Sequence, residues 1–216
     1  MKVTGDANVG EGMLDGTITV RGKVAANAVR YHGTVDVDGL VEVAGAVSGS
    51  GTLHVGQTFH AGDADLKGTV KVEGALSVDR KLSVRGGLSA PSLAAADFAL
   101  DGEAQIPGAL TGTTVSARLA ADSTFGSVRA RSVSLRAKMP NLVQVAFWGR
   151  IQVTVDRVEA DAVELEGVEV EYVRSPKITL GRNAHVTSYD GTIVRRASSS
   201  RVGYESKSRP PYGLRR

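Results

Sequence analysis

The chain has 216 residues, of which 42% are hydrophobic, and this suits one folded domain with flanking segments. Aromatic residues make up only 5% and there are 26 glycines, so a thin, layered interior is favoured over a wide sandwich. The absence of cysteine excludes a disulfide framework and a thiolate metal site. With a net charge of +3, no apolar run near the ~20 residues of a membrane span and no secretory signal, we expect a cytoplasmic protein, with membrane association left open.

Residues 1–15 form an N-terminal segment, and a glycine series begins after it. Several later glycines lie six residues apart and enclose units of the form Gly-x-(Val/Ile/Leu)-x-Val-x-Gly, at 16–22, 33–39 and 68–74. Two apolar residues at i and i+2, flanked by polar ones, indicate a short half-buried strand. Helical spacing is sustained nowhere, so we predict an all-β chain.

The larger period of the glycines predicts how these strands are arranged. Gly16, Gly33, Gly51 and Gly68 recur at a nearly constant interval and suit corners that need a positive φ or no Cβ. Three short strands per coil of ~17 residues then give a single-stranded parallel β-helix, with coils stacked at ~4.8 Å. The predicted inward columns are Ile18, Val35, Leu53 and Val70, and beside them Val20, Val37, Val55 and Val72. An antiparallel sandwich or barrel is the alternative, but a six-residue gap leaves little chain for hairpins.

The rod is predicted to span residues 16–194, about ten coils, with one irregular stretch. Residues 136–150 break the pattern and contain the only tryptophan, Trp148. This stretch is either an outward loop or an irregular coil whose bulky residues fill the interior. The alternating pattern then returns and continues to Val194.

Residues 195–216 form a basic tail that we expect to be disordered. They hold seven basic residues and one acid, a net +6, whereas the other 194 residues carry −3. Three roles stay open: a solubilising end, contact with an anionic membrane surface, or contact with nucleic acid. The basic residues are Arg195, Arg196, Arg201, Lys207, Arg209, Arg215 and Arg216.

The repeat unit, the scarcity of aromatics and the polar flanks resemble the bactofilins, the bacterial polymer-forming cytoskeletal family. The resemblance covers most of residues 16–194 and is strongest to bacillus-type members, whose rod carries an irregular stretch before the last coils. It implies a right-handed β-helix and filaments that form end to end without nucleotide. It also implies that the main partner is the protein itself, beside unknown adaptor proteins. The short hydrophobic N-terminal segment by which some members reach membranes is not evident here.

A β-helix enzyme or glycan-binding module acting on polysaccharide is the competing hypothesis, and its candidate residues are weak. The four histidines, His32, His54, His60 and His185, are interpreted as solvated surface residues, since His54 and His60 take outward positions and spacing implies no partner carboxylate for a general base. Seven acids fall within sixteen residues but sit between inward apolar positions, so we interpret them as a charged coat. They are Asp156, Glu159, Asp161, Glu164, Glu166, Glu169 and Glu171. A phosphate-binding loop is not indicated, because Gly16 and Gly22 are separated by five residues where such a loop needs four. We therefore predict no catalytic, metal or cofactor site.

Self-association is predicted at the ends, because the terminal coils of a solenoid expose an unpaired strand edge and neither end has an evident cap. The resemblance suggests that like ends meet. The residues predicted to join rods are Ile18, Val20 and Val24 at one end and Ile178, Leu180, Val186 and Ile193 at the other.

Overall fold

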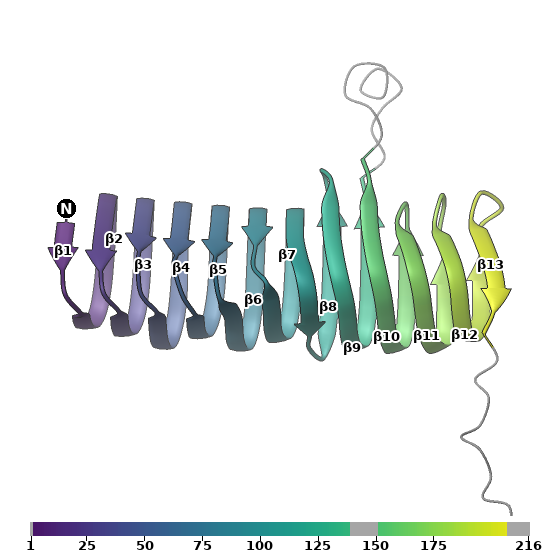
Figure 1. Ribbon diagram of the computed structural model, residues 1–216, viewed down its shortest axis with the longest axis horizontal. Helices are drawn as coiled ribbons and strands as arrows, with labels where there is room; N and C mark the ends of the chain where they lie inside the picture. Colours follow the sequence, from purple (N-terminus) through teal and green to yellow (C-terminus); the bar gives the residue numbers. More distant parts are fainter. Residues whose placement is uncertain (1, 139–150, 207–216) are drawn as a thin grey trace, which may run out of the picture.

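The alternating apolar residues form strands that stack in one direction along a single rod (Figure 1). The computed structural model describes residues 2–138 and 151–206 and is an all-β parallel solenoid of about 11 turns. Its strands follow chain order in one sheet. They are β1 Lys2–Thr4, β2 Ala7–Arg21, β3 Val24–Val37, β4 Val41–Val55, β5 Phe59–Val72, β6 Ala75–Ser89, β7 Ser92–Thr111, β8 Thr114–Leu119, β9 Ser123–Ala137, β10 Val153–Glu166, β11 Glu169–Leu180, β12 His185–Arg196 and β13 Arg201–Glu205.

Most coils consist of one long strand that bends at corners, where separate short strands were predicted. In β3 the buried side chains come in three pairs two residues apart, so the coil has three walls with two inward residues each. The pairs are Val24 and Ala26, Val29 and Tyr31, and Val35 and Val37. Hydrogen bonding passes through the corners because the neighbouring coil bends at the same place. The predicted solenoid with coils of about 17 residues is confirmed.

The predicted inward columns are also present. Ile18 pairs with Val35, Val35 with Leu53, and Leu53 with Val70, and all four are at most 4% exposed. Stacked aliphatic side chains fill a narrow prism, so large aromatics are needed at few places. The second column of Val20, Val37, Val55 and Val72 is buried in the same way.

Six corner glycines form a column of their own, which explains their spacing. Each pairs with the next along the rod and has a φ between +86° and +154°. From the second onward, a Cβ would overlap the backbone of the glycine one coil before. The corners therefore require glycine for both backbone conformation and space. The column is Gly16, Gly33, Gly51, Gly68, Gly86 and Gly102.

The coils extend beyond the predicted bounds of 16–194. The first long strand, β2, begins at Ala7, and β13 adds a further strand at Arg201–Glu205. At the irregular stretch, Ser123 of β9 pairs directly with Val153 of β10, so no coil separates these two strands. Residues 139–150, including Trp148, lie outside the described residues. In the part of the chain that is described, no helix is long and apolar enough to cross a membrane.

Tyr31 brings a polar hydroxyl into the apolar interior. Tyr31 is 2% exposed, and its ring occupies the space that a side chain at Gly49, its partner on the next coil, would need. Its hydroxyl has no hydrogen-bond partner within the described residues. Burial raises the pKa of Tyr31 to about 12, because the ionised form would lose its hydration.

Replacement of Tyr31 by phenylalanine is expected to raise the free energy of unfolding by about 1 kcal/mol at neutral pH, because it removes a buried hydroxyl that forms no bond. The gain in stability should widen as pH rises from 10, the ordinary pKa of a tyrosine, towards the raised pKa of Tyr31 at about 12. There the unfolded tyrosine ionises while the folded one stays neutral, and the wild type loses stability. Urea unfolding at pH 7 and pH 11 measures both effects. Tyr204→Phe is the matched control, since Tyr204 is 67% exposed; a lower stability of Tyr31→Phe at neutral pH would show that the hydroxyl does have a partner.

Candidate functional site

The outward side chains form ladders along the rod, and the histidines belong to these ladders. Nδ1 of His54 lies 2.8 Å from a carboxylate oxygen of Asp36, one coil before, and its Nε2 lies 3.4 Å from Glu73. Spacing along the sequence implied no partner carboxylate for His54, and the structure brings two close to it. The coil period itself was the missed signal, because side chains one coil apart in the sequence become neighbours on the wall.

The other histidines have similar neighbours. His60 lies 3.7 Å from Asp79 and His185 lies 3.5 Å from Glu169. His32 instead hydrogen-bonds through Nδ1 to the hydroxyl of Ser50 at 2.6 Å. Each of these contacts joins two adjacent coils, so their immediate effect is to hold the coils together at the surface.

An open depression lies on the wall beside Gly49. Arg30, His32, Ser48 and Ser50 are among the residues that line it. Cations and carboxylates are mixed around it, with Lys67 and Asp65 on the next coil. Because both signs of charge line the depression, it favours neither an anionic nor a cationic ligand. Among the described residues, no three metal-binding side chains converge on one point.

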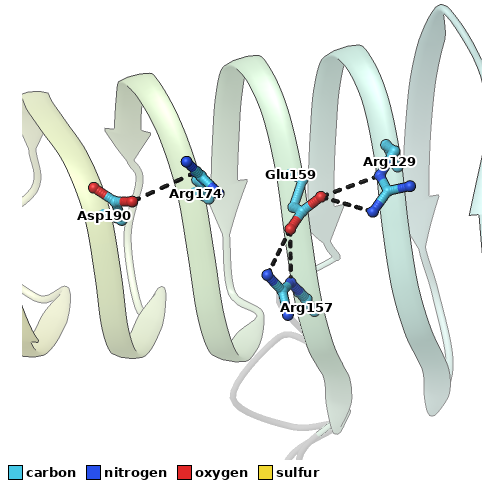
Figure 2. Close-up of polar contacts among 5 residues, drawn as sticks. All are labelled: Arg129, Arg157, Glu159, Arg174 and Asp190. Atoms are coloured by element: carbon cyan, nitrogen blue, oxygen red, sulfur yellow. Dashed lines mark hydrogen bonds and ion pairs between the residues drawn. The ribbon is translucent and has the colours of Figure 1, made fainter. Parts of the chain in front are cut away.

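The predicted acidic coat is interleaved with arginines from neighbouring coils. Figure 2 shows Glu159 between Arg129 on the preceding coil, with an N–O distance of 2.9 Å, and Arg157 on its own strand, at 2.7 Å. Arg174, on the coil after Glu159, lies 3.5 Å from Asp190. Opposite charges thus alternate along this ladder.

The pairing changes the chemistry of Glu159. Its partial burial raises the pKa, but hydrogen bonds from Arg129 and Arg157 outweigh this effect and hold the pKa of Glu159 below its ordinary value. An ionised, paired carboxylate is a poor proton donor at neutral pH. Glu164 is also paired, with Arg136 at 2.8 Å. These acids hold coils together and coat the wall with charge.

The residues predicted to join rods lie mostly one coil inside the ends. Six of the seven are at most 7% exposed, and Ile193 is half-buried. The terminal strands cover them, since Val3 pairs with Val20, Ala7 with Val24, and Val202 with Val186. The six buried residues are Ile18, Val20, Val24, Ile178, Leu180 and Val186.

The outermost residues of the N-terminal end belong to β1 and β2. β1 pairs with Thr19–Arg21 only, so within the described residues β2 has no strand partner on this side from residue 8 to residue 16. Val9 and Met13 lie on this edge and are 40% and 67% exposed. The end therefore combines unpaired backbone groups with exposed apolar side chains.

The C-terminal end has the same character. β13 pairs with the first part of β12, from His185 to Tyr189, and the rest of β12 has no outer strand among the described residues. Val194 on β12 is 53% exposed and Tyr204 on β13 is 67% exposed. These two residues, with Val9 and Met13, are the exposed large hydrophobic residues of the described chain, and all four lie at its ends (Figure 1).

The structure describes three of the seven basic residues predicted to contact a polyanion. Arg195 and Arg196 end β12 and Arg201 begins β13, so these three are ordered and exposed at the C-terminal end. The others, Lys207, Arg209, Arg215 and Arg216, lie outside the described residues.

Comparison of the chain with family models, with curated proteins and with solved structures gave no match. Function is therefore inferred from the sequence and from the geometry of the rod.

Proposed function

We propose that this protein is a self-assembling scaffold of the bactofilin type, whose rods join end to end into filaments without nucleotide. The observation that carries the proposal is the position of the exposed apolar residues. Val9 and Met13 lie at one end and Val194 and Tyr204 at the other, each on a strand without an outer neighbour along part of its length in the described chain.

Stacking of a second rod on either end would pair the open strand edge and bury the exposed apolar side chains at once. Unpaired N–H and C=O groups of the edge strand would continue the hydrogen-bond ladder. The half-buried residues Val3, Leu14, Ile193 and Val202, which pack against the core from the ends, would become fully buried. Each large side chain taken from partial to full burial contributes on the order of 1 kcal/mol, against which the cost of association must be set.

The walls of the rod are unsuited to such contacts. Ion pairs cover them, among them Glu159 with Arg129, Glu164 with Arg136, and His54 with Asp36. Charged side chains on a sheet surface oppose lateral association. Apolar ends with unpaired strand edges, combined with charged walls, favour filaments one rod thick.

Substitution of both Val9 and Met13 by lysine is expected to shorten the filaments to small oligomers. The two lysines remove apolar area and place charge on the open edge without disturbing the core, because both positions are exposed. Electron microscopy and sedimentation of purified protein without nucleotide measure the result, and circular dichroism should remain β-rich.

The matched control adds two lysines to the middle of the wall. Thr114→Lys with Ser116→Lys changes the charge equally, and Ser116 lies in the same ladder as Met13. This variant should form filaments like the wild type. Wild-type protein that stays monomeric across concentrations and salt conditions, or equal loss of filaments in both variants, would contradict end-to-end assembly.

A further inference from the structure

Several aspartates of the chain are followed directly by glycine, a pair that can rearrange without an enzyme because glycine has no Cβ to hinder ring closure. The glycine nitrogen attacks the side-chain carboxyl carbon, the amide proton and the carboxyl hydroxyl leave as water, and a succinimide ring forms. Water then opens the ring, and opening at the former main-chain carbonyl leaves isoaspartate, whose backbone runs through the side chain. The composition is unchanged overall, so water is the only co-reactant. The pairs are Asp15–Gly16, Asp38–Gly39, Asp101–Gly102 and Asp190–Gly191.

The position of each pair along the rod decides how readily it reacts. The glycine nitrogen has to turn towards the side chain, so a peptide group that is bonded in the strand ladder must first open. Opening costs least where a strand has a neighbour on one side only.

Asp15–Gly16 has the fewest restraints of the four pairs. It lies on β2 at the N-terminal end of the rod (Figure 1), where it pairs with His32 and Gly33 on the next coil and has no outer strand among the described residues. Asp15 is exposed, and its side chain forms no hydrogen bond or ion pair within the described chain. Gly16 has a φ of +86°, and no atom lies within 4 Å of the place that a Cβ would take. This corner is therefore open to solvent.

The two pairs in the interior of the rod are held more tightly. The amide of Gly39 donates to the carbonyl of Gly22 at 3.0 Å, so the nitrogen that would attack Asp38 is already bonded. Asp101–Gly102 is paired on both sides, with β6 and with β8, and Nζ of Lys138 lies 3.0 Å from the Asp101 carboxylate. Both pairs have to break such contacts before the ring can close.

The pair at the C-terminal end is intermediate. Asp190–Gly191 follows Tyr189, the last residue of β12 that pairs with β13, so it also has a strand on one side only in the described chain. The Asp190 side chain, however, is 24% exposed and lies 3.5 Å from Arg174 on the preceding coil. Its carboxylate is therefore restrained where that of Asp15 is free to turn.

We propose that Asp15 is a site of spontaneous isoaspartate formation, and that this change prevents the N-terminal end of the rod from joining another rod. The second part rests on the end-to-end assembly proposed above. Isoaspartate adds one atom to the backbone next to Gly16, so the residues on its two sides no longer face a partner strand in one register. An arriving strand would pair with only part of the altered edge.

Ageing of the full-length protein tests the site. Samples kept dilute, so that rods stay apart, are digested with trypsin at intervals; heavy-oxygen water marks each ring that has opened, and fragmentation assigns the residue. Cleavage after lysine and arginine places the four pairs in separate peptides, residues 3–21, 31–67, 86–118 and 183–195. Isoaspartate should form at least about tenfold faster at Asp15 than at Asp38 or Asp101, which corresponds to about 1.4 kcal/mol in the free energy of opening. The rate at Asp190 should fall between them.

Asp15→Glu is the matched control for the effect on joining. Glutamate keeps the charge, but its longer side chain closes a larger ring far more slowly. When aged samples are concentrated, the fraction of wild-type protein that sediments should fall as isoaspartate accumulates at Asp15, whereas Asp15→Glu should sediment as it does when fresh.

The outcomes separate the site from its effect. Equal rates at Asp15 and Asp101 overturn the site. Modification of Asp15 with undiminished sedimentation, or the same decline in Asp15→Glu, overturns the effect on joining. If fresh wild-type protein forms no filaments, the proposed function and the effect on joining both fail, whereas the peptide measurement still decides the site.

Discussion

Gly68→Ala is expected to lower the free energy of unfolding by about 3–5 kcal/mol. Gly68 has a φ of +108°, and a Cβ there would overlap the carbonyl oxygen of Gly51 on the preceding coil. The substitution therefore combines an unfavourable backbone conformation with a clash against backbone atoms of a neighbour that cannot rotate away. Urea unfolding followed by circular dichroism measures the loss.

Substitutions at two other glycines separate the cost of the backbone conformation from the cost of the clash. Gly16 has a φ of +86° but no atom within 4 Å of the added Cβ, so Gly16→Ala should cost only the conformational part, about 1–2 kcal/mol. Gly10 has neither feature, and Gly10→Ala should be neutral or slightly stabilising. Equal losses for Gly68→Ala and Gly16→Ala would show that the corner glycines are not in backbone contact.

Val70→Asp is expected to destabilise the protein by at least about 3 kcal/mol, or to prevent folding, because it buries a carboxylate without a partner. Val70 is 1% exposed and lies between Leu53 and Leu88 in its column. Thermal unfolding by circular dichroism and solubility on expression are the measurements.

The adjacent residue provides the control. Lys71 points outward, its side chain is 54% exposed, and it pairs with Glu73 at 2.6 Å. Lys71→Ala should cost at most about 1 kcal/mol, as for other exposed ion pairs. The reverse order of effects would mean that the register of this wall is shifted by one residue.

The sequence predicted the middle of the rod well for a physical reason. A corner that admits only glycine and an inward column that admits only apolar residues constrain Gly33, Gly51, Gly68 and their neighbours coil after coil. Two independent signals, the glycine period and the alternation of apolar residues, therefore coincide there.

The ends were harder to predict because these constraints weaken there. Residues from Ala7 to Asp15 form part of the first coil, but with a neighbour on one side only they need neither regular glycines nor buried apolar residues. The same holds for β13, which lies inside the predicted tail. Partners such as Arg129 and Glu159 lie on either side of the stretch outside the described residues, so a fixed coil period does not connect them.

The change in coil length along the rod limits which coils can replace one another. Near the N-terminus Thr34 pairs with Thr52, whereas near the C-terminus Thr154 pairs with Glu169 and Glu169 with His185, so the later coils contain fewer residues. A coil moved from one half of the rod to the other would therefore bring the wrong number of residues between its corners. Its inward residues would then be out of register with the columns above and below, so the order of the coils is set by their length as well as by their side chains.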